Sequence, residues 1–411
     1  MTPIDRGEAP TPQEAPVETM TGRRRPVIGL PKCTNPAEKR FPLTPEAVGV
    51  LVGNGFNVNI EEGAAESIHY GDNAYVKAGA RITSRRDALR ADIVIHLAPL
   101  EVADIRQLSR SALLLSLANF NRPQAREVID ELIKRRVVNV AIDLIRDEQG
   151  NHPFGDILSE INGRSAMTIA AAMLADPVNG KGILLGGIAG VIPCEVTVIG
   201  SCLAAMAAAR SAMGLGAVVR LFDDDVYRLR TALRQLGGGV IGSSVHPHAL
   251  ENALRTADVI VVSDRSKPLP LECSTDCLLK RKVLVFDLSC TPGQAFPAMK
   301  TIDLGEIDVE KAAGSSSFAL YNAAAEANGN RHTCFINAGS AVPRTTAMAL
   351  SDTFVTLLTK IEGIEGSGPL LPLGPGLQEA TLTFMGKVVN ERVAKLAGIR
   401  FTDIRLLMSL S

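Results

Sequence analysis

The stretch from residue 194 to 225 constrains the fold of this 411-residue chain more than any other part of it. Residues 195–199 alternate β-branched side chains, Gly200 permits a sharp turn, and the alanine-rich run 203–213 favours a helix that a Gly-Leu-Gly sequence ends. A second apolar strand, residues 218–222, then leads into three consecutive aspartates. This order of strand, turn, helix and strand predicts the first βαβ unit of a dinucleotide-binding fold.

The turn after the first of these strands carries an incomplete dinucleotide fingerprint. The three glycines of a G-x-G-x-x-G motif correspond to Gly200, Cys202 and Ala205, with Ser201 inside the turn. Ala205 meets the need for a small residue where the helix packs on the strand. Cys202, by contrast, puts a thiol where a pyrophosphate would approach the N-terminus of the helix. The motif therefore predicts the fold, with the binding of NAD weakened or lost.

Asp223 is the first of the three aspartates, at the place where an acid would bind the ribose 2′-hydroxyl of NAD. Its carboxylate would repel a 2′-phosphate, so NAD is favoured over NADP if either binds. A run of three acids after a strand is also typical of a solvated turn. The sequence leaves both interpretations open.

Length and composition favour two globular domains. The chain is 46% hydrophobic, and its net charge of −1 and pI near 6.6 give no global attraction to nucleic acid or to an anionic membrane. The longest uncharged segments, 182–194 and 196–209, are shorter than the roughly 20 apolar residues of a membrane-spanning helix. Seven scattered cysteines without a C-x-x-C pair indicate reduced thiols in the cytoplasm. Cys273 and Cys277 lack a second pair, so no metal site is predicted.

We predict an α/β fold: two Rossmann-like doubly wound parallel-sheet domains with a cleft between them. Short apolar strands alternate with helical stretches from residue 26 onward, and about six strands are expected in the second domain. A helix at 156–176 would lead from one domain into the other. After Asp303 the sequence is rich in Ala, Ser and Asn, and we expect a helix at 354–361 and then a helical tail.

These patterns give approximate domain boundaries. They are a disordered N-terminal arm at 1–25, an N-terminal substrate domain at 26–155, an NAD-binding domain at 156–305, and a C-terminal return to the substrate domain at 306–411.

A set of sequence motifs, taken in order, resembles the alanine dehydrogenase family, which is related to the nicotinamide-binding subunit of proton-translocating transhydrogenase. The motifs are IGLPKCTNPAEKRFPLTPEAV, DILSEINGRSAM, GKGILLGGIAGVIPCEVTVIG, ADVIVV, INAGSAVPRT and the ending GIRFTDIRLLM. The resemblance covers about residues 26–411. It implies an NAD cleft between two Rossmann-like domains, C-terminal helices that close the first domain, and a homohexamer.

Of four chemical groups that the resemblance implies, one is retained. The arginine that binds the substrate carboxylate corresponds to Arg40. The substrate lysine corresponds to Ala98 and the catalytic histidine to Asn119. The active-site aspartate corresponds to Cys290 or Thr291.

Oxidative deamination needs a base to accept protons and, in reverse, a cation to polarise the carbonyl. Asn119 can form hydrogen bonds but cannot titrate. His96 lies two positions before Ala98, would point the same way on a strand, and could take over the missing role; a packed or capping histidine is the alternative. For Arg40, carboxylate binding and a surface salt bridge both remain open.

Three functions are consistent with these residues. The missing groups favour a catalytically degenerate member that acts as a structural or regulatory homologue, in a homo-oligomer or a hetero-oligomer with an active relative. An active NAD-dependent dehydrogenase of L-alanine or a similar small amino acid is the main alternative. A sensor that binds a small amino acid or 2-oxo acid without hydride transfer is the third.

Overall fold

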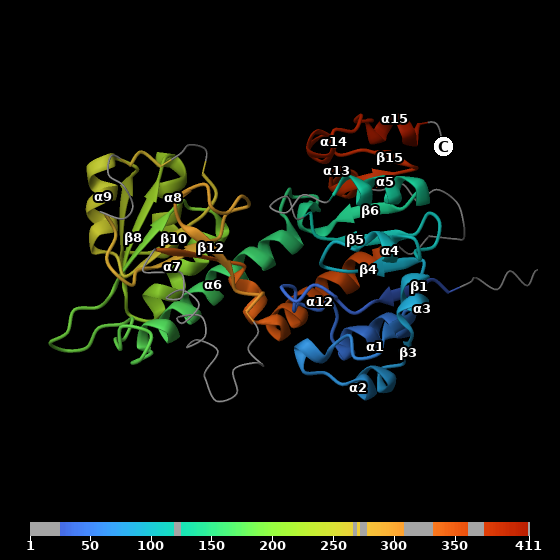
Figure 1. Cartoon of the computed structure of the whole chain (residues 1–411), viewed down its shortest axis with the longest axis horizontal. Coiled ribbons are helices and arrows are strands. Elements are labelled where there is room, and N and C mark those ends of the chain that lie inside the picture. Colours follow the sequence, from blue (N-terminus) through green and yellow to red (C-terminus); the bar gives the residue numbers. More distant parts are fainter. Residues whose placement is uncertain are drawn as a thin grey trace, which may run out of the picture.

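A computed structural model describes residues 25–118, 125–265, 269–271, 278–307, 332–360 and 374–409. It contains two α/β domains, each built on its own largely parallel sheet, which confirms the predicted fold class (Figure 1). The predicted N-terminal arm, apart from Arg25, and the candidate residue Asn119 lie outside the described residues.

The first domain is built on an eight-stranded sheet. Its strand order is β15 (Lys387–Val388), β14 (Thr381–Phe384), β6 (Val138–Ala141), β5 (Leu113–Ser116), β4 (Ile93–Ile95), β1 (Val27–Leu30), β2 (Asn57–Glu61) and β3 (Arg81–Thr83). The strands from β6 to β3 pair in parallel, whereas β14 pairs antiparallel with β6 and with β15. The sheet is therefore a parallel one with an antiparallel edge.

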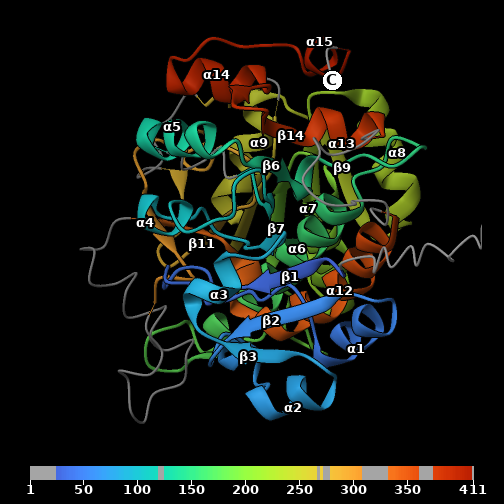
Figure 2. The ribbon, with the colours of Figure 1, turned by 90° about the vertical axis from the view of Figure 1, so that its right-hand side faces the viewer.

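Helices cover both faces of the first sheet, as a parallel sheet requires. They are α1 (Pro45–Gly53), α2 (Asp72–Lys77), α3 (Arg85–Leu89), α4 (Val102–Ile105), α5 (Arg126–Arg135), α12 (Pro343–Lys360), α13 (Pro375–Ala380), α14 (Glu391–Ala397) and α15 (Ile404–Met408), with short 3-10 turns at Glu66–Ile68 and Ile142–Leu144. The largest core cluster joins one face of the sheet to α1, α2 and α12, and a second joins the other face to α3, α4 and α5. Figure 2 places α2 and α14 at opposite ends of the domain.

The second domain is built on a seven-stranded sheet in which every pair is parallel. Its strand order is β12 (Lys300–Asp303), β13 (Thr333–Ile336), β11 (Leu284–Asp287), β10 (Val259–Val262), β7 (Glu195–Ile199), β8 (Val218–Asp223) and β9 (Val240–Ser244). The described residues of this domain form the helices α7 (Leu203–Gly214), α8 (Val226–Leu236) and α9 (Pro247–Thr256), with a 3-10 turn at Ala338–Ala341.

The predicted βαβ unit is confirmed as β7, α7 and β8. Gly200 has a φ of +95°, and a side chain there would begin 2.3 Å from the Ser263 hydroxyl oxygen, so only glycine fits this turn. Ala205 is fully buried on α7, as the helix–strand contact requires. The β-branched residues of the strand and the small residues of the turn and helix therefore predicted this βαβ unit correctly.

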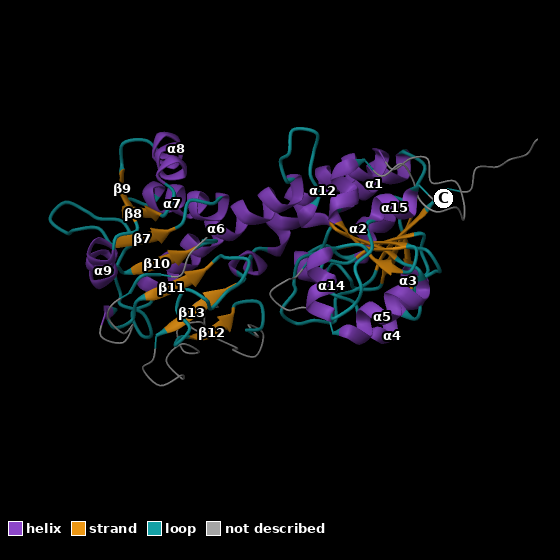
Figure 3. Cartoon of the chain, turned by 90° about the horizontal axis from the view of Figure 1, so that it is seen from above, coloured by secondary structure: helices purple, strands orange, loops and turns teal. Residues whose placement is uncertain are grey.

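A long helix, α6 (Pro153–Ala175), links the domains (Figures 1 and 3). It packs against α7 of the second domain and against α12, which in turn packs on α1 of the first domain. The absence of a side chain at Gly163 brings α6 close to α7: a Cβ there would lie 2.1 Å from the Ala204 carbonyl oxygen. The expected linking helix thus exists and begins at Pro153.

The structure contradicts the expected helical tail and slightly exceeds the expected number of about six strands in the second sheet. The tail is not purely helical, because β14 and β15 extend the first sheet beyond β6. The second sheet has seven strands, one more than expected, because β12 and β13 both follow residue 299. β12 has a polar, half-exposed sequence, Lys-Thr-Ile-Asp, which carries no apolar signal for an edge strand.

Candidate functional site

Each sheet has a point where its strand order reverses, and ligands of open α/β sheets bind at the carboxyl edge beside this point. In the first sheet the reversal lies between β1 and β4, and in the second between β7 and β10. Arg40 and His96 follow β1 and β4, while Gly200, Ser201 and Cys202 follow β7. The predicted site residues within the described chain therefore lie at these two edges.

The loop after β1 is fixed against the second domain. The backbone carbonyl of Ala37 accepts hydrogen bonds from the Ser340 hydroxyl at 2.9 Å and from the Asn337 amide at 3.3 Å. The same amide donates to Asp303 at 3.1 Å, at the end of β12. The carboxyl edge of the first sheet thus faces the carboxyl edge of the second.

Arg40 forms an internal ion pair with Glu38. The Arg40 Nε donates to Glu38 Oε1 at 2.7 Å, and Nη2 contacts Oε2 at short range. The two side chains are only 14% and 7% exposed. Although burial acts in the opposite direction, the charge and hydrogen bonds of Glu38, with smaller contributions from Asp143 and Asp303, raise the pKa of Arg40. The guanidinium fork predicted to hold a substrate carboxylate is therefore already held by a carboxylate of the chain.

His96 is buried at the end of β4, with 4% of its surface exposed. Its Nδ1 lies 2.6 Å from the carbonyl oxygen of Ala98, and its buried Nε2 has no hydrogen-bond partner among the described residues. Burial lowers the pKa of His96, and the nearby charge of Arg85 acts in the same direction. The ring is therefore neutral at neutral pH, with Nδ1–H as the donor and Nε2 as a free acceptor.

Asp143, which sequence reasoning missed, lies on the same edge directly after β6. Its Oδ1 accepts a hydrogen bond from the backbone N–H of Ala118 at 2.8 Å, and burial raises its pKa against the opposing charges of Arg40 and His152. A carboxyl group with a raised pKa beside an arginine is a common feature of acid–base sites. Its position after the buried strand β6 is the signal that could have identified it.

His152, at the start of α6, is the second group that the sequence did not single out. The Nδ1 atom of its ring is buried without a hydrogen-bond partner in the described part of the chain. Its charge lowers the pKa of Asp143, so the two groups are near enough to interact. Asp143 therefore lies under the influence of both Arg40 and His152.

In the second domain, the Asp223 carboxylate is 1% exposed and accepts three hydrogen bonds. The donors are the Ser201 hydroxyl at 2.5 Å, the Asp225 backbone N–H at 2.8 Å and the Arg228 guanidinium at 3.0 Å. Burial alone would raise the pKa of Asp223, but these hydrogen bonds outweigh it and lower the pKa. The acid predicted to bind a ribose is therefore satisfied internally, and the interpretation as a solvated turn does not apply to its side chain.

Cys202 is the N-cap residue of α7, and its side chain makes no capping hydrogen bond. Its side chain therefore stands at the N-terminus of α7, beside a carboxylate, Asp223, that is already hydrogen-bonded to Ser201 and Arg228.

Cys290 lies after β11, where its backbone N–H donates to Asp264 Oδ1 at 2.7 Å. Cys290 is an exposed residue, but partial burial of its thiol raises the thiol pKa, and the charges of Asp264, Cys202 and Asp143 act in the same direction. Asp143 belongs to the first domain, and its charge acts on this thiol of the second domain. The thiol therefore lies where the carboxyl edges of the two sheets meet.

Within the described ranges, no group of three or more His, Cys, Asp or Glu side chains could hold a metal ion. No helix in that part of the chain is both long and apolar enough to cross a membrane.

The two sheets, their order and the facing edges define a two-domain protein of the Rossmann type. Residues 29–161 match the N-terminal domain of the family described as alanine dehydrogenase/PNT, and residues 166–298 match its C-terminal domain. The chain belongs to the alanine dehydrogenase/PNT family.

Relatives and solved structures agree with this assignment. The alanine dehydrogenase of Geobacillus stearothermophilus is 27% identical over 383 residues, which cover 93% of this chain and 99% of that protein. That of Mycolicibacterium smegmatis is 27% identical over 384 residues, covering 92% and 98%. A solved L-alanine dehydrogenase has a TM-score of 0.72 at 24% identity, covering 90% of this chain and 98% of that one. The transhydrogenase of Sinorhizobium meliloti has a TM-score of 0.66 at 20% identity, covering 89% and 99%; both structures support the fold.

Proposed function

We propose that this chain is a catalytically degenerate member of its family that acts as a structural or regulatory subunit. It would assemble with itself or with an active relative. The observation that carries the proposal is the environment of His96: this histidine, two positions before the residue that corresponds to the family's lysine, is buried, neutral and bonded to the carbonyl of Ala98. A neutral imidazole cannot supply the positive charge that a lysine would bring to a developing oxyanion.

The ion pair of Arg40 supports the same proposal. A substrate carboxylate would have to displace Glu38 from both nitrogens that it contacts. The displaced Glu38 would then remain a largely buried charge without its partner, which is costly. Binding of a small amino acid or 2-oxo acid at Arg40 is therefore expected to be weak.

The test is an assay of the purified chain with NAD and a panel of small L-amino acids, and with NADH, ammonia and 2-oxo acids. We expect no turnover above the rate without protein, and a change in activity or assembly when the chain is mixed with an active relative. Turnover of any substrate in the panel would contradict the loss of catalysis. A relative that neither binds the chain nor changes in activity would leave a homo-oligomeric role.

A second candidate function, an NAD-dependent dehydrogenase of L-alanine or a similar amino acid, is favoured by Asp143. This carboxyl has a raised pKa and lies near Arg40 where the two edges meet. It would accept a proton as the amine is oxidised. Turnover in the parent chain that Asp143→Asn removes would support this candidate.

The third possibility is a ligand sensor. It would be supported if amino or 2-oxo acids raised the melting temperature of the chain while no turnover was detected.

Replacing Cys202 by glycine is expected to strengthen the binding of NADH by roughly tenfold or more, because the backbone N–H groups at the start of α7 become accessible to a pyrophosphate. The titration follows the fluorescence of NADH, which is free of tryptophan emission because the chain contains none. Cys194→Gly is a matched control, since this thiol lies before β7 and bonds to the Leu184 carbonyl. Equal affinity in the parent and Cys202→Gly would show that the thiol does not restrict the site.

Asparagine in place of Asp143 is expected to raise the melting temperature at pH 7. The folded pKa of this acid lies above its unfolded value, so its stabilising contribution is complete below the unfolded pKa of about 3.9 and is lost as pH rises through the folded pKa. The gain should therefore shrink as the pH falls from 7 towards 4, close to the unfolded pKa of the acid.

The matched control for this prediction is Asp147→Asn. Hydrogen bonds from Asn151 and from backbone N–H groups lower the pKa of Asp147, so its replacement should give no gain at pH 7. Melting curves at both pH values would check the pair. A lower melting temperature for Asp143→Asn at pH 7 would mean that the attraction of Arg40 exceeds the effect of burial.

A further inference from the structure

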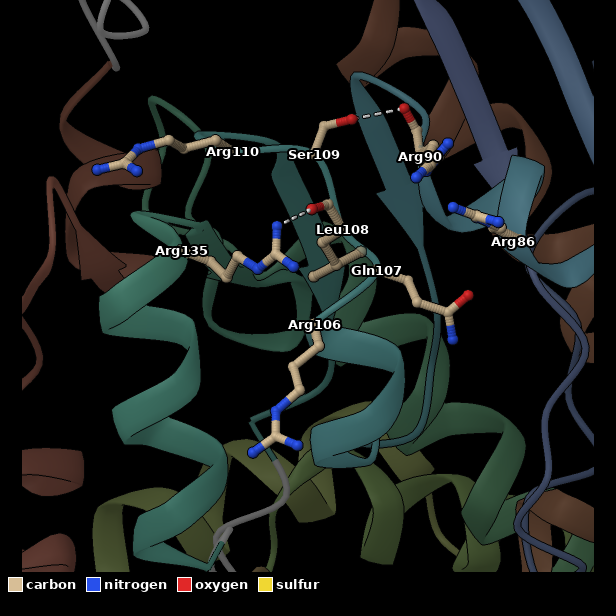
Figure 4. Close-up of a pocket in the computed structure, with 8 residues that line it drawn as sticks. All are labelled: Arg86, Arg90, Arg106, Gln107, Leu108, Ser109, Arg110 and Arg135. Atoms are coloured by element: carbon tan, nitrogen blue, oxygen red, sulfur yellow. Dashed lines mark hydrogen bonds between the residues drawn. The ribbon is translucent and has the colours of Figure 1, made fainter.

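Five arginine side chains surround a hollow of about 490 Å³ on the first domain (Figure 4). They are Arg86, Arg90, Arg106, Arg110 and Arg135. Arg86 and Arg90 precede β4, Arg106 and Arg110 precede β5, and Arg135 precedes β6. Because these strands are parallel, the hollow lies at the amino edge of the sheet, opposite the edge that carries Arg40 and His96. It is therefore separate from the candidate functional site.

Hydrogen bonds between the three segments hold the lining in place. The Ser109 hydroxyl donates to the carbonyl oxygen of Arg90 at 2.6 Å, and Nη1 of Arg135 donates to the carbonyl oxygen of Leu108 at 3.3 Å. The backbone N–H of Ser111 donates to the carbonyl oxygen of Arg135 at 3.1 Å, and Ser111 has a φ of +63°, unusual for a residue with a side chain. The loop before β5 thus connects the segments before β4 and β6.

The positive charge around the hollow is only partly balanced. Arg106 pairs with Glu131 at 3.7 Å. Arg86, Arg90 and Arg110 form no ion pair with the described residues of the chain. Arg86 and Arg90 are both exposed, lie four residues apart in the chain, and line the same hollow (Figure 4). Like charges at this spacing repel each other, and a bound anion would remove that repulsion.

The shape and chemistry of the hollow indicate the class of anion. Guanidinium groups bind phosphate oxygens in pairs, and several guanidinium groups around one hollow favour an anion with more than one phosphate. The volume lies in the range typical of small-molecule sites. No aromatic ring is among the lining residues, so the stacking surface that single-stranded nucleic acids use is missing.

We propose that this hollow binds a small molecule that carries a pyrophosphate or polyphosphate group, such as inorganic pyrophosphate or a nucleoside diphosphate. Arg86 and Arg90 hold one phosphate, and Arg110 and Arg135 extend the site towards the next. The site is independent of the proposed loss of catalysis, because it uses neither sheet's carboxyl edge.

Isothermal titration calorimetry of the full-length chain with inorganic pyrophosphate, at constant ionic strength, tests the proposal. We expect saturable binding by the parent and a loss of roughly tenfold or more in affinity for Arg86→Gln/Arg90→Gln. The control is Arg210→Gln/Arg234→Gln, which removes the same charge from exposed positions on α7 and α8 of the second domain and should bind like the parent. Thermal unfolding without ligand establishes that all three proteins are folded.

A parallel titration with ADP distinguishes a site that recognises only the diphosphate from one that also recognises a nucleoside. Equal affinities for ADP and pyrophosphate would mean that the diphosphate alone is recognised, and tighter binding of ADP would add a contact with the nucleoside. Both results support the site if the Arg86→Gln/Arg90→Gln variant binds ADP and pyrophosphate more weakly than the parent does. Absence of binding to the parent, or equal binding by the two double variants, would overturn the proposal. The second result would place pyrophosphate elsewhere, for example at the turn after β7.

Discussion

Replacing Glu38 by alanine is expected to lower the free energy of unfolding by about 3 kcal/mol, the lower end of the range for breaking a buried ion pair. Arg40 would lose both side-chain hydrogen bonds to Glu38 and would keep a guanidinium that is 14% exposed. The effect falls at the lower end because Asp143 and Asp303 also attract this charge. Urea denaturation at pH 7 would measure it.

A matched control is Glu66→Ala, which breaks an exposed pair with Lys32 whose side chains are 70% and 46% exposed. An exposed pair of this kind contributes about 1 kcal/mol or less. The double variant Glu38→Ala/Arg40→Met should recover most of the loss, because no buried charge then remains. Equal losses for Glu38→Ala and Glu66→Ala would mean that Arg40 finds another partner, and would strengthen the case that it can receive a substrate carboxylate.

The second large effect is expected from Gly163→Ala, which should destabilise the chain by about 3 kcal/mol or more. The added Cβ would lie 2.1 Å from the Ala204 carbonyl oxygen and 2.9 Å from the Ala208 nitrogen. Both are backbone atoms of α7 that no side-chain rotation can move, so α6 must shift away. A shift here also moves the N-terminus of α7 and the turn at Cys202, so any binding of NADH should weaken together with stability.

Gly49→Ala provides the control for this prediction. It also lies inside a helix, α1, but a Cβ there would be 3.8 Å from its nearest neighbour, Ala78. Alanine at such a position should stabilise the chain by about 0.5 to 1 kcal/mol through helix propensity. Thermal unfolding of both variants should therefore change in opposite directions. A similar melting temperature for Gly163→Ala and the parent would mean that the two helices can separate without cost.

Much of the candidate cofactor site could be predicted from sequence. Gly200, Ala205 and Asp223 lie where the pattern of one βαβ unit places them, because their positions depend on residues within about 30 places along the chain. The pairing of Asp223 with Arg228 could not be predicted in the same way. It depends on how a long, exposed side chain folds back over the carboxyl edge.

The side chains at the carboxyl edge of the first sheet were harder to predict. Glu38 and Arg40 are two residues apart, but their burial results from contact of the Ala37 backbone with Asn337 and Ser340, some 300 residues later. Asp143 carries no motif of its own, and its raised pKa arises only from burial where the domains meet. Strand β14 was missed because it is short and follows a helix, so pairing with β6 decides its conformation.

The sequence by itself determined the α/β class, the βαβ unit from β7 to β8 and the turn at Gly200, because helix and strand periodicities and glycine geometry are local properties of the chain. Only the tertiary structure decided which charges are paired and which titratable groups meet. It brought Arg40 near Asp143, and it gathered the arginines that precede three parallel strands around one hollow. Burial and long-range contacts set these features, and neither is encoded in the spacing of residues along the chain.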